Sequence, residues 1–550
     1  MAERFEHHAR LMTVLTLVSR VTGLVRDAAL ARVFGVGPLM DAFNFAFVIP
    51  NLFRRLFGEG AISAAFLPRY AELDRDDPEA ARRYSGLMLA LLAAVLWGIV
   101  IVGELLILGR WAASPALDVS GAGPLRVGGI PIEVLTVQHV RLGYELAALM
   151  LPYMPLVCLT AVGGSALQVH GRFGPTAASP IILNLAMIAA TLGVLPLVHA
   201  GSFDEVTHIR IVAGAVLVAG ILQLAWTFHA LRIVRPVFAP RDPVAWASVQ
   251  STLRQTFPMM LGLGVLQVNT AIDGLIASWP TIVGPTIFGF DYPLETGAMS
   301  AMANAQRLYE FPLGVFGISI ATAVFPLLAR QNNDLPAFAA TVRRALRLTV
   351  FIGLPASAGL CVLAYDAAGA FFRGGQFDAA DVQRVGFIVI GFAPAIWSYQ
   401  MNHVFTRAFY ALKEPMTPVK VSVAMVALNL ALNCTLIFTP LREAGLAWST
   451  AFCSVLQIAI LGRMLARRAP GIVDGEVVGS WRRSLIASAV MAAAVFGVVH
   501  FLLPADDRWS VYALRLGVGV VVGAGLYFAL ARLMGMQELR DVLRRGARSA

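Results

Sequence analysis

The first two lipid-length apolar stretches of this chain carry an unusual number of ionisable side chains. They are Arg20, Arg26, Asp27, Arg32, Asp41, Arg54 and Arg55. A charge at mid-membrane costs about 2.5–3.5 kcal/mol on insertion scales, so it normally faces a polar interior and marks a functional site. An arginine near a helix end can instead extend its head group to water, which is enough to explain Arg32 and Arg55. The remaining arginines predict that the first two helices form walls of a cationic cavity.

In the first stretch, Ser19, Gly23 and Arg26 share one face at helical spacing, with Arg20 and Asp27 beside it. Gly23 leaves room for a ligand or for a closely packed helix. The alternative role for Asp27 is purely structural, because it can neutralise Arg26 or a neighbouring arginine within the bundle.

The second stretch combines charges with a helix break. Its candidate site residues are Asp41, Asn51, Arg54 and Glu59. Pro50 removes a helical hydrogen bond in mid-membrane. Arg55 and Glu59 are four residues apart and can pair on one face, which leaves Arg54 without an obvious local partner. An arginine in that position suits an anionic ligand, although a bond to Asp41 or to another helix is the alternative.

The eighth predicted span repeats this pattern. It carries Asn304, Arg307, Glu310 and Gly314 along one stripe, and Pro312 interrupts its hydrogen bonds. We expect four arginines to surround one central space: Arg20, Arg26, Arg54 and Arg307. Guanidinium groups bind phosphate in a bidentate way and stay charged when partly dehydrated. The sequence therefore predicts an arginine site for a phosphate group.

The composition is that of a membrane protein. Hydrophobic residues make up 58% of the 550 residues and charged residues 14%, where soluble proteins average about 25% charged; the mean hydropathy is +0.72. Basic connections alternate along the chain with connections that are poor in basic residues, as the positive-inside rule requires. This alternation accounts for the net charge of +10 without nucleic-acid binding. It places both termini in the cytoplasm and predicts an even number of spans, about fourteen by length.

The predicted spans are 10–34, 39–66, 85–110, 144–171, 178–199, 209–232, 250–279, 297–327, 341–365, 383–411, 417–439, 442–466, 481–504 and 509–533. Two short echoes indicate an internal repeat. Phe57-Gly58 recurs as Phe316-Gly317, and the Leu-Asn-Leu-Ala sequence around Asn184 recurs around Asn429. Both echoes shift by six spans, which preserves orientation and predicts parallel repeats. We therefore expect a first lobe at 1–240, a second at 241–470, and a C-terminal helix pair with a basic tail at 471–550.

A second group of polar residues suggests an ion. Asp273, Asn429, Asn433 and Thr450 lie inside the seventh, eleventh and twelfth spans. Their oxygen atoms suit a hard monovalent cation or a proton, and interhelical hydrogen bonding is the alternative. The four cysteines lie in apolar segments without metal-ligand or disulfide spacing. We expect no other cofactor, and no motif indicates an enzyme. A membrane-embedded glycosyltransferase would need an acidic pair near the outer surface, for which Asp204-Glu205 is a weak candidate.

Three runs of residues resemble the MurJ/MviN family of lipid II flippases, which belongs to a superfamily of multidrug and polysaccharide exporters. They are Ser19-Arg20-Val-Thr-Gly23-Leu-Val-Arg26-Asp27, Pro50-Asn51-Leu-Phe-Arg54-Arg55-Leu-Phe-Gly-Glu59-Gly60-Ala61 and Gln306-Arg307-Leu-Tyr-Glu310-Phe311-Pro312-Leu-Gly314-Val-Phe-Gly317. The resemblance extends to helix number, topology and repeat. It implies an all-α polytopic fold of two six-helix lobes and an added C-terminal helix pair.

The resemblance also implies the function. It predicts an inner-membrane protein that moves lipid II, the undecaprenyl-pyrophosphate-linked peptidoglycan precursor, to the outer leaflet by alternating access. Family residues important for function match Arg20, Arg26, Asp41, Arg54, Glu59 and Arg307, and Asn51 lies among them. The family's sodium site uses the seventh, eleventh and twelfth helices, where Asp273, Asn429, Asn433 and Thr450 lie. A neutral Asn433 suits Na+ less well than a carboxylate. We expect lipid II and the bilayer as partners, and a monomer. The alternative is an exporter of another undecaprenyl-linked glycan, such as an O-antigen unit.

Overall fold

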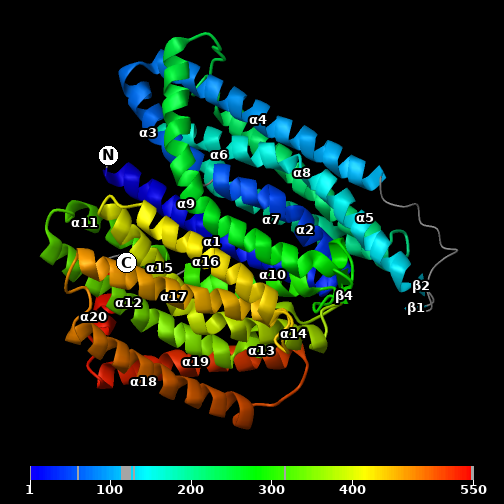
Figure 1. Ribbon diagram of the computed structural model, residues 1–550, viewed down its shortest axis with the longest axis vertical. Helices are drawn as coiled ribbons and strands as arrows, with labels where there is room; N and C mark the ends of the chain where they lie inside the picture. The colour runs from blue at the N-terminus through cyan, green and yellow to red at the C-terminus, as the bar shows by residue number, and fades with distance from the viewer. Residues whose placement is uncertain (1, 59–60, 113–125, 128–129, 315–317, 547–550) are drawn as a thin grey trace. The chain divides into compact units, whose positions relative to one another are not determined.

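The computed structural model describes residues 2–58, 61–112, 126–127, 130–314 and 318–546. Nearly all of them are helical (Figure 1), which confirms the prediction of an all-α chain. Two antiparallel hairpins pair β1 (Arg126–Val127) with β2 (Ile130–Pro131) and β3 (Thr286–Ile287) with β4 (Phe290–Asp291). The hairpins lie in the two longest connections of the predicted topology, 111–141 and 280–298, both of which we expect on the outer side of the membrane. The glycines of the connection 111–141 predict a flexible loop or at most a hairpin there, and residues 113–125 and 128–129 of it lie outside the described residues.

The chain divides into two compact units, Met1–Ser300 and Ala301–Ala550. The helices of the first unit are α1 (Ala2–Phe34), α2 (Pro38–Phe53), η1 (Arg54–Gly58), α3 (Ala61–Asp76), α4 (Pro78–Ala112), α5 (Ile132–Met150), α6 (Tyr153–Val169), α7 (Gly174–His199), α8 (Glu205–Ala230) and α9 (Pro243–Ile282). The helix α9 packs on α2, α3 and α4 of this unit. This packing places α9 with the first half of the chain. The internal repeat instead assigns α9 to a second lobe that starts at residue 241. The division into these lobes stays a prediction.

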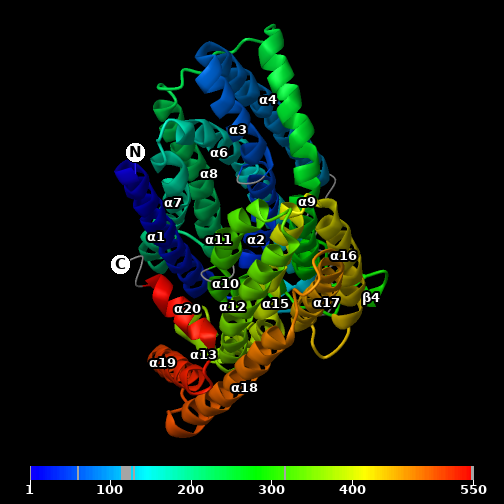
Figure 2. The ribbon, with the colours of Figure 1, turned by 90° about the vertical axis from the view of Figure 1, so that its left-hand side faces the viewer.

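The second unit begins within α10 (Ala298–Pro312). Its further helices are α11 (Ile318–Arg330), α12 (Leu335–Val362), α13 (Ala364–Phe372), α14 (Ala379–Phe392), η4 (Ala393–Ala395), α15 (Ile396–Ala411), α16 (Met416–Leu436), α17 (Ala444–Arg468), α18 (Gly475–Gly497), η5 (Val498–Leu502), α19 (Trp509–Leu533) and α20 (Gln537–Gly546). The C-terminal helices α18 and α19 lie side by side (Figure 2). They match the predicted C-terminal pair of spans.

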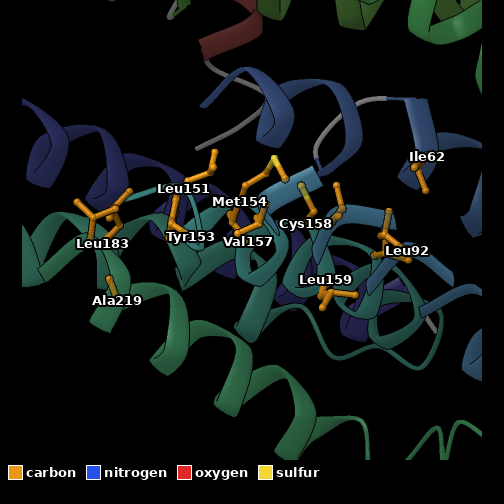
Figure 3. Close-up of a cluster of buried hydrophobic side chains, with 14 of the residues drawn as sticks. Ile62, Leu92, Leu151, Tyr153, Met154, Val157, Cys158, Leu159, Leu183 and Ala219 are labelled. Carbon is orange, nitrogen blue, oxygen red and sulfur yellow. The ribbon is translucent and has the colours of Figure 1, made fainter. Parts of the chain in front are cut away.

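The core of the first unit is built around α6. This helix is apolar nearly all round, so it is buried on every side. Figure 3 shows its side chains Tyr153, Met154 and Cys158 among apolar residues of the neighbouring helices, such as Leu92 of α4 and Leu183 of α7. This core fixes the helices that carry the first group of predicted site residues.

Ten of the described helices or helix pairs are long and apolar enough to cross a membrane. The other four predicted spans correspond to α1, α2 with α3, α9, and α10 with α11. All four contain predicted site residues.

The second predicted span is broken in its middle. After Pro50 the α-helix gives way to the π-helical turn η1, in which each hydrogen bond reaches one residue further than in an α-helix. After α10 the residues Leu313 and Gly314 are also π-helical. The repeat that aligns Phe57 with Phe316 aligns Arg54 with Leu313, so π-helical residues occur at matching positions in both halves of the chain.

Candidate functional site: arginines held by polar partners

Arg26 lies at the centre of a polar cluster between α1 and α7, which pack along each other. Its Nε and Nη2 atoms donate to Oδ1 of Asp27, at 2.8 and 2.6 Å, and its Nη1 donates to Oδ1 of Asn184 at 3.0 Å. The side chain of Arg26 is 11% exposed and that of Asp27 12%. The predicted structural role of Asp27 is thus present, because the ion pair lowers the cost of holding a guanidinium in this position.

Asn184 connects this arginine to the backbone of α1. Its Nδ2 donates to the carbonyl oxygen of Ser19 and to Oγ1 of Thr22, both at 3.1 Å. A Cβ atom at Gly23 would lie 3.4 Å from that amide nitrogen, so glycine allows the close approach of the two helices. Asn184 belongs to the repeated Leu-Asn-Leu-Ala sequence, but no local pattern in the sequence indicates that it bonds an arginine 158 residues away.

The other arginines of the first unit have different surroundings. Arg20 is exposed on α1. Arg54 donates to Oδ1 of Asn51 from Nε at 3.2 Å and from Nη2 at 2.8 Å. The expectation that Arg54 has no local partner is therefore wrong, since Asn51 lies one helical turn before it. Arg55 donates to Oε1 of Gln267 in α9 at 3.3 Å, and its predicted partner Glu59 lies outside the described residues.

Asp41 is fully buried near the start of α2. Its carboxylate accepts hydrogen bonds from the backbone nitrogen atoms of Gly297 (2.6 Å) and Ser300 (2.8 Å) and from the hydroxyl of Thr281 (3.0 Å). These donors lie at the first turn of α10 and at the end of α9, so the carboxylate caps the N-terminus of α10. In this structure Asp41 holds helices together. This structural role does not need any contact between Asp41 and the substrate.

In the second unit, Arg307 lies on α10 as predicted. Its Nη1 is 3.4 Å from Oε2 of Glu310, one turn along the helix, and the two side chains are 40% and 39% exposed. An exposed pair of this kind contributes at most about 1 kcal/mol to stability. Arg307 is therefore accessible to a ligand, and the pair does little to hold it in place. Whether it shares a site with the arginines of the first unit stays a prediction.

Comparison with known proteins decides the family. A family model described as lipid II flippase MurJ matches residues 30–518. The chain belongs to the MurJ family of lipid II flippases. This result confirms the resemblance seen in the three sequence runs. It also makes the chain a multi-pass membrane protein of a transporter family.

Curated relatives in the MurJ family match nearly the whole chain. A probable lipid II flippase MurJ from Rhizobium tropici is 31% identical over 534 residues, which cover 94% of this chain and 92% of the relative. The lipid II flippase MurJ of Burkholderia cenocepacia is 28% identical over 550 residues, which cover 96% of this chain and 97% of the relative.

Solved structures show the same fold. A lipid II flippase MurJ in an inward closed conformation matches with a TM-score of 0.74 at 20% identity, covering 97% of this chain and 99% of that one. An inward-facing multidrug resistance transporter of the MATE family, in the MOP superfamily, matches with a TM-score of 0.63 at 13% identity, covering 84% and 98%. Together they confirm a polytopic helical fold for this MurJ-family chain.

The residues proposed for an ion are divided between the two units of this MurJ-family chain. Asp273 is buried on α9 of the first unit, where it accepts a hydrogen bond from Nδ2 of Asn269 at 3.3 Å. The other three lie on α16 and α17 of the second unit. Within the described residues, no group of three or more His, Cys, Asp or Glu side chains is placed to hold a metal ion.

The amides of α16 form a hydrogen-bonded network. Nδ2 of Asn433 donates to Oδ1 of Asn429 at 3.0 Å, and the Ser449 hydroxyl donates to Oδ1 of Asn433. Nδ2 of Asn429 donates to the hydroxyls of Ser449 (3.1 Å) and Thr450 (3.3 Å). Both amide oxygens thus accept a hydrogen bond from a neighbouring side chain, which fits the alternative of structural hydrogen bonding better than Na+ coordination. Na+ binding stays a prediction, and no step of the proposed transport uses it.

Proposed function

We propose that this chain moves lipid II from the inner to the outer leaflet of the bacterial cytoplasmic membrane. The observation that carries the proposal is the buried guanidinium of Arg26, fixed by Asp27 and Asn184 inside a membrane protein of the MurJ family. A guanidinium has five N–H donors, and these partners accept three of them. Two donors on Arg26 remain to bind a pair of phosphate oxygens.

The ion pair explains how the site stays stable when no substrate is bound. Asp27 compensates Arg26 while no anion is bound, which keeps an arginine tolerable in the bilayer. The pair has no net charge, so attraction of a pyrophosphate depends on the further positive charge of Arg20, Arg54 and Arg307. In the proposed cycle these arginines take the head group from the cytoplasmic side, and the lipid tail stays in the bilayer beside the C-terminal helices α18 and α19.

Release follows from rocking of the two halves of the chain, with both termini in the cytoplasm. The membrane potential is worth about 2.3 kcal/mol per charge per 100 mV. Because the interior is negative, it draws the emptied cationic site back toward the cytoplasm. The cycle contains no catalytic step, and one chain is sufficient for it.

The test is a translocation assay with the purified chain in vesicles that contain labelled lipid II. We expect lipid II to become accessible on the opposite leaflet only when the protein is present, and we expect the gene to restore growth of a bacterium depleted of its lipid II flippase. An undecaprenyl-pyrophosphate-linked O-antigen unit is the matched comparison substrate. Faster transport of that lipid than of lipid II would contradict the proposal.

A further inference from the structure

The membrane helix α15 shows an inverted pattern of burial. Its apolar and small residues, among them Val404, Phe405 and Ala408, are buried against α11, α12 and α17. The residues that stay accessible are mostly polar. They are Trp397, Tyr399, Asn402, His403, Thr406, Arg407 and Tyr410.

Five of these residues form one stripe, because their spacings of three and four residues place them on one side of a helix. We call Tyr399, Asn402, His403, Thr406 and Arg407 the α15 polar face. Helices that present a side to lipid look different in this chain. The accessible residues of α8 include Val218 and Ile221, and Val521 of α19 is 71% exposed.

A lipid environment does not fit the α15 polar face. Arg407 lies about one turn from the end of α15 and can extend to water from there. Asn402 and His403 lie deeper, and Tyr399 is about 12 Å along the helix from Arg407 at 1.5 Å per residue. Hydrocarbon tails give these groups no hydrogen-bonding partners. The hydroxyl oxygen of Tyr399 and the amide oxygen of Asn402 are buried inside the unit, whereas Thr406 and Arg407 are partly exposed. The Thr406 and Arg407 end of the face must therefore border a water-filled or substrate-filled space.

The Tyr399 end of the face is continuous with α10. The Tyr399 ring packs against the Tyr309 ring, with centroids 5.5 Å apart, and Tyr309 packs against Phe392 at 4.6 Å. Tyr309 follows Arg307 by two residues on α10. Three rings from α10, α14 and α15 thus join the helix of a predicted phosphate ligand to the polar face within one unit.

We propose that the α15 polar face binds the phosphorylated glycan head group during transport, a role that rests on the proposed function. The guanidinium of Arg407 complements the negative phosphates. The hydroxyl of Thr406 and the imidazole of His403 supply hydrogen bonds to sugar hydroxyls, and the ring of Tyr399 supplies a flat apolar surface for a sugar ring. The face runs toward the cytoplasmic end of the span in the predicted topology, so it contacts the head group on entry.

The first experiment measures access to water and does not depend on transport. Thr406→Cys is treated with a negatively charged, membrane-impermeant thiosulfonate that is supplied on both sides of the membrane. The matched control is Leu430→Cys on α16, since Leu430 is 40% exposed and apolar. Labelling of the unchanged chain, with its four cysteines, is subtracted. We expect the thiol introduced by Thr406→Cys to react and the thiol introduced by Leu430→Cys to stay unreacted. Added lipid II should slow the reaction in Thr406→Cys alone.

The second experiment measures transport in vesicles. We expect Arg407→Gln to lower the rate of lipid II transport about tenfold at low substrate, as the loss of a charge-assisted hydrogen bond predicts. The matched control is Arg463→Gln. Arg463 is an exposed arginine near the C-terminal end of α17, and its loss should change the transport rate less than about twofold.

The outcomes separate the two proposals. If the unchanged chain moves no lipid II, the proposed function fails, and labelling of Thr406→Cys still reports whether the face borders water. If transport is normal in Arg407→Gln and lipid II does not protect the thiol of Thr406→Cys, the α15 proposal is overturned. The same holds if Thr406→Cys is labelled no faster than Leu430→Cys.

Discussion

Asn184 of α7 and Asn429 of α16 occupy the same place in the repeated Leu-Asn-Leu-Ala sequence, and their surroundings differ in charge. The amide of Asn184 accepts a hydrogen bond from the guanidinium of Arg26 and ties it to the backbone of α1. The amide of Asn429 bonds neutral side chains of α16 and α17. The comparison teaches that both halves keep an interior amide that joins helices, and that in the first half the amide also orients a charge.

The largest expected effect comes from removing that charge. We predict that Arg26→Ala abolishes growth of a flippase-depleted bacterium, because it removes a phosphate donor and leaves Asp27 without its cation. Arg32→Ala is the matched control, as Arg32 is an exposed arginine on the same helix, and it should grow normally. Full growth of a well-expressed Arg26→Ala variant would remove this cluster from the mechanism.

The two asparagines can be compared directly by the same substitution. Asn184→Leu should lower lipid II transport about tenfold, because the guanidinium loses one charged hydrogen bond. Asn429→Leu should leave the transport rate of the folded protein unchanged and lower its stability by about 0.6–1.7 kcal/mol, the range for hydrogen bonds between membrane helices. Transport rates in vesicles and thermal unfolding midpoints measure the two effects. Equal losses of transport in both variants would mean that the halves use their amides alike.

The smallest expected effect concerns sodium. Because both amide oxygens of α16 accept hydrogen bonds from neighbouring side chains, replacing Na+ by choline should leave the unfolding temperature of the purified chain unchanged. Asn433→Leu serves as the control, since it removes the oxygen that accepts from Ser449. A stabilisation by Na+ that disappears in Asn433→Leu would instead identify a sodium site and would make the second half the site of ion coupling.

Much of the architecture could be predicted from the sequence. Length and apolar composition locate the spans, and the cost of charge in a bilayer singles out Arg26, Arg54 and Arg307. Short-range partners were partly predictable, as for Asp27, which follows Arg26 directly. The bond from Arg54 to Asn51 was missed although the two residues are three apart on one helix.

Long-range partners could not be predicted, because only the packing of distant helices creates them. The carboxylate of Asp41 bonds atoms 240 to 259 residues away, so a sequence pattern cannot separate a helix cap from a ligand contact. The α15 polar face is different. The run from Tyr399 to Arg407 is visibly polar for a membrane span, and reading its period of three to four residues would have found it.

The wide turn at Arg54–Gly58 has a mechanical consequence. A π-helical turn holds one surplus residue relative to an α-helix. Tightening this turn to an α-helix would advance the helix that follows it by about 1.5 Å and rotate that helix by about 100° relative to the helix before the turn. Arg54 lies at the start of this turn, and Leu313 and Gly314 are π-helical in the other half. Winding of the turn would therefore re-aim the Arg54 head group relative to the helix that follows it.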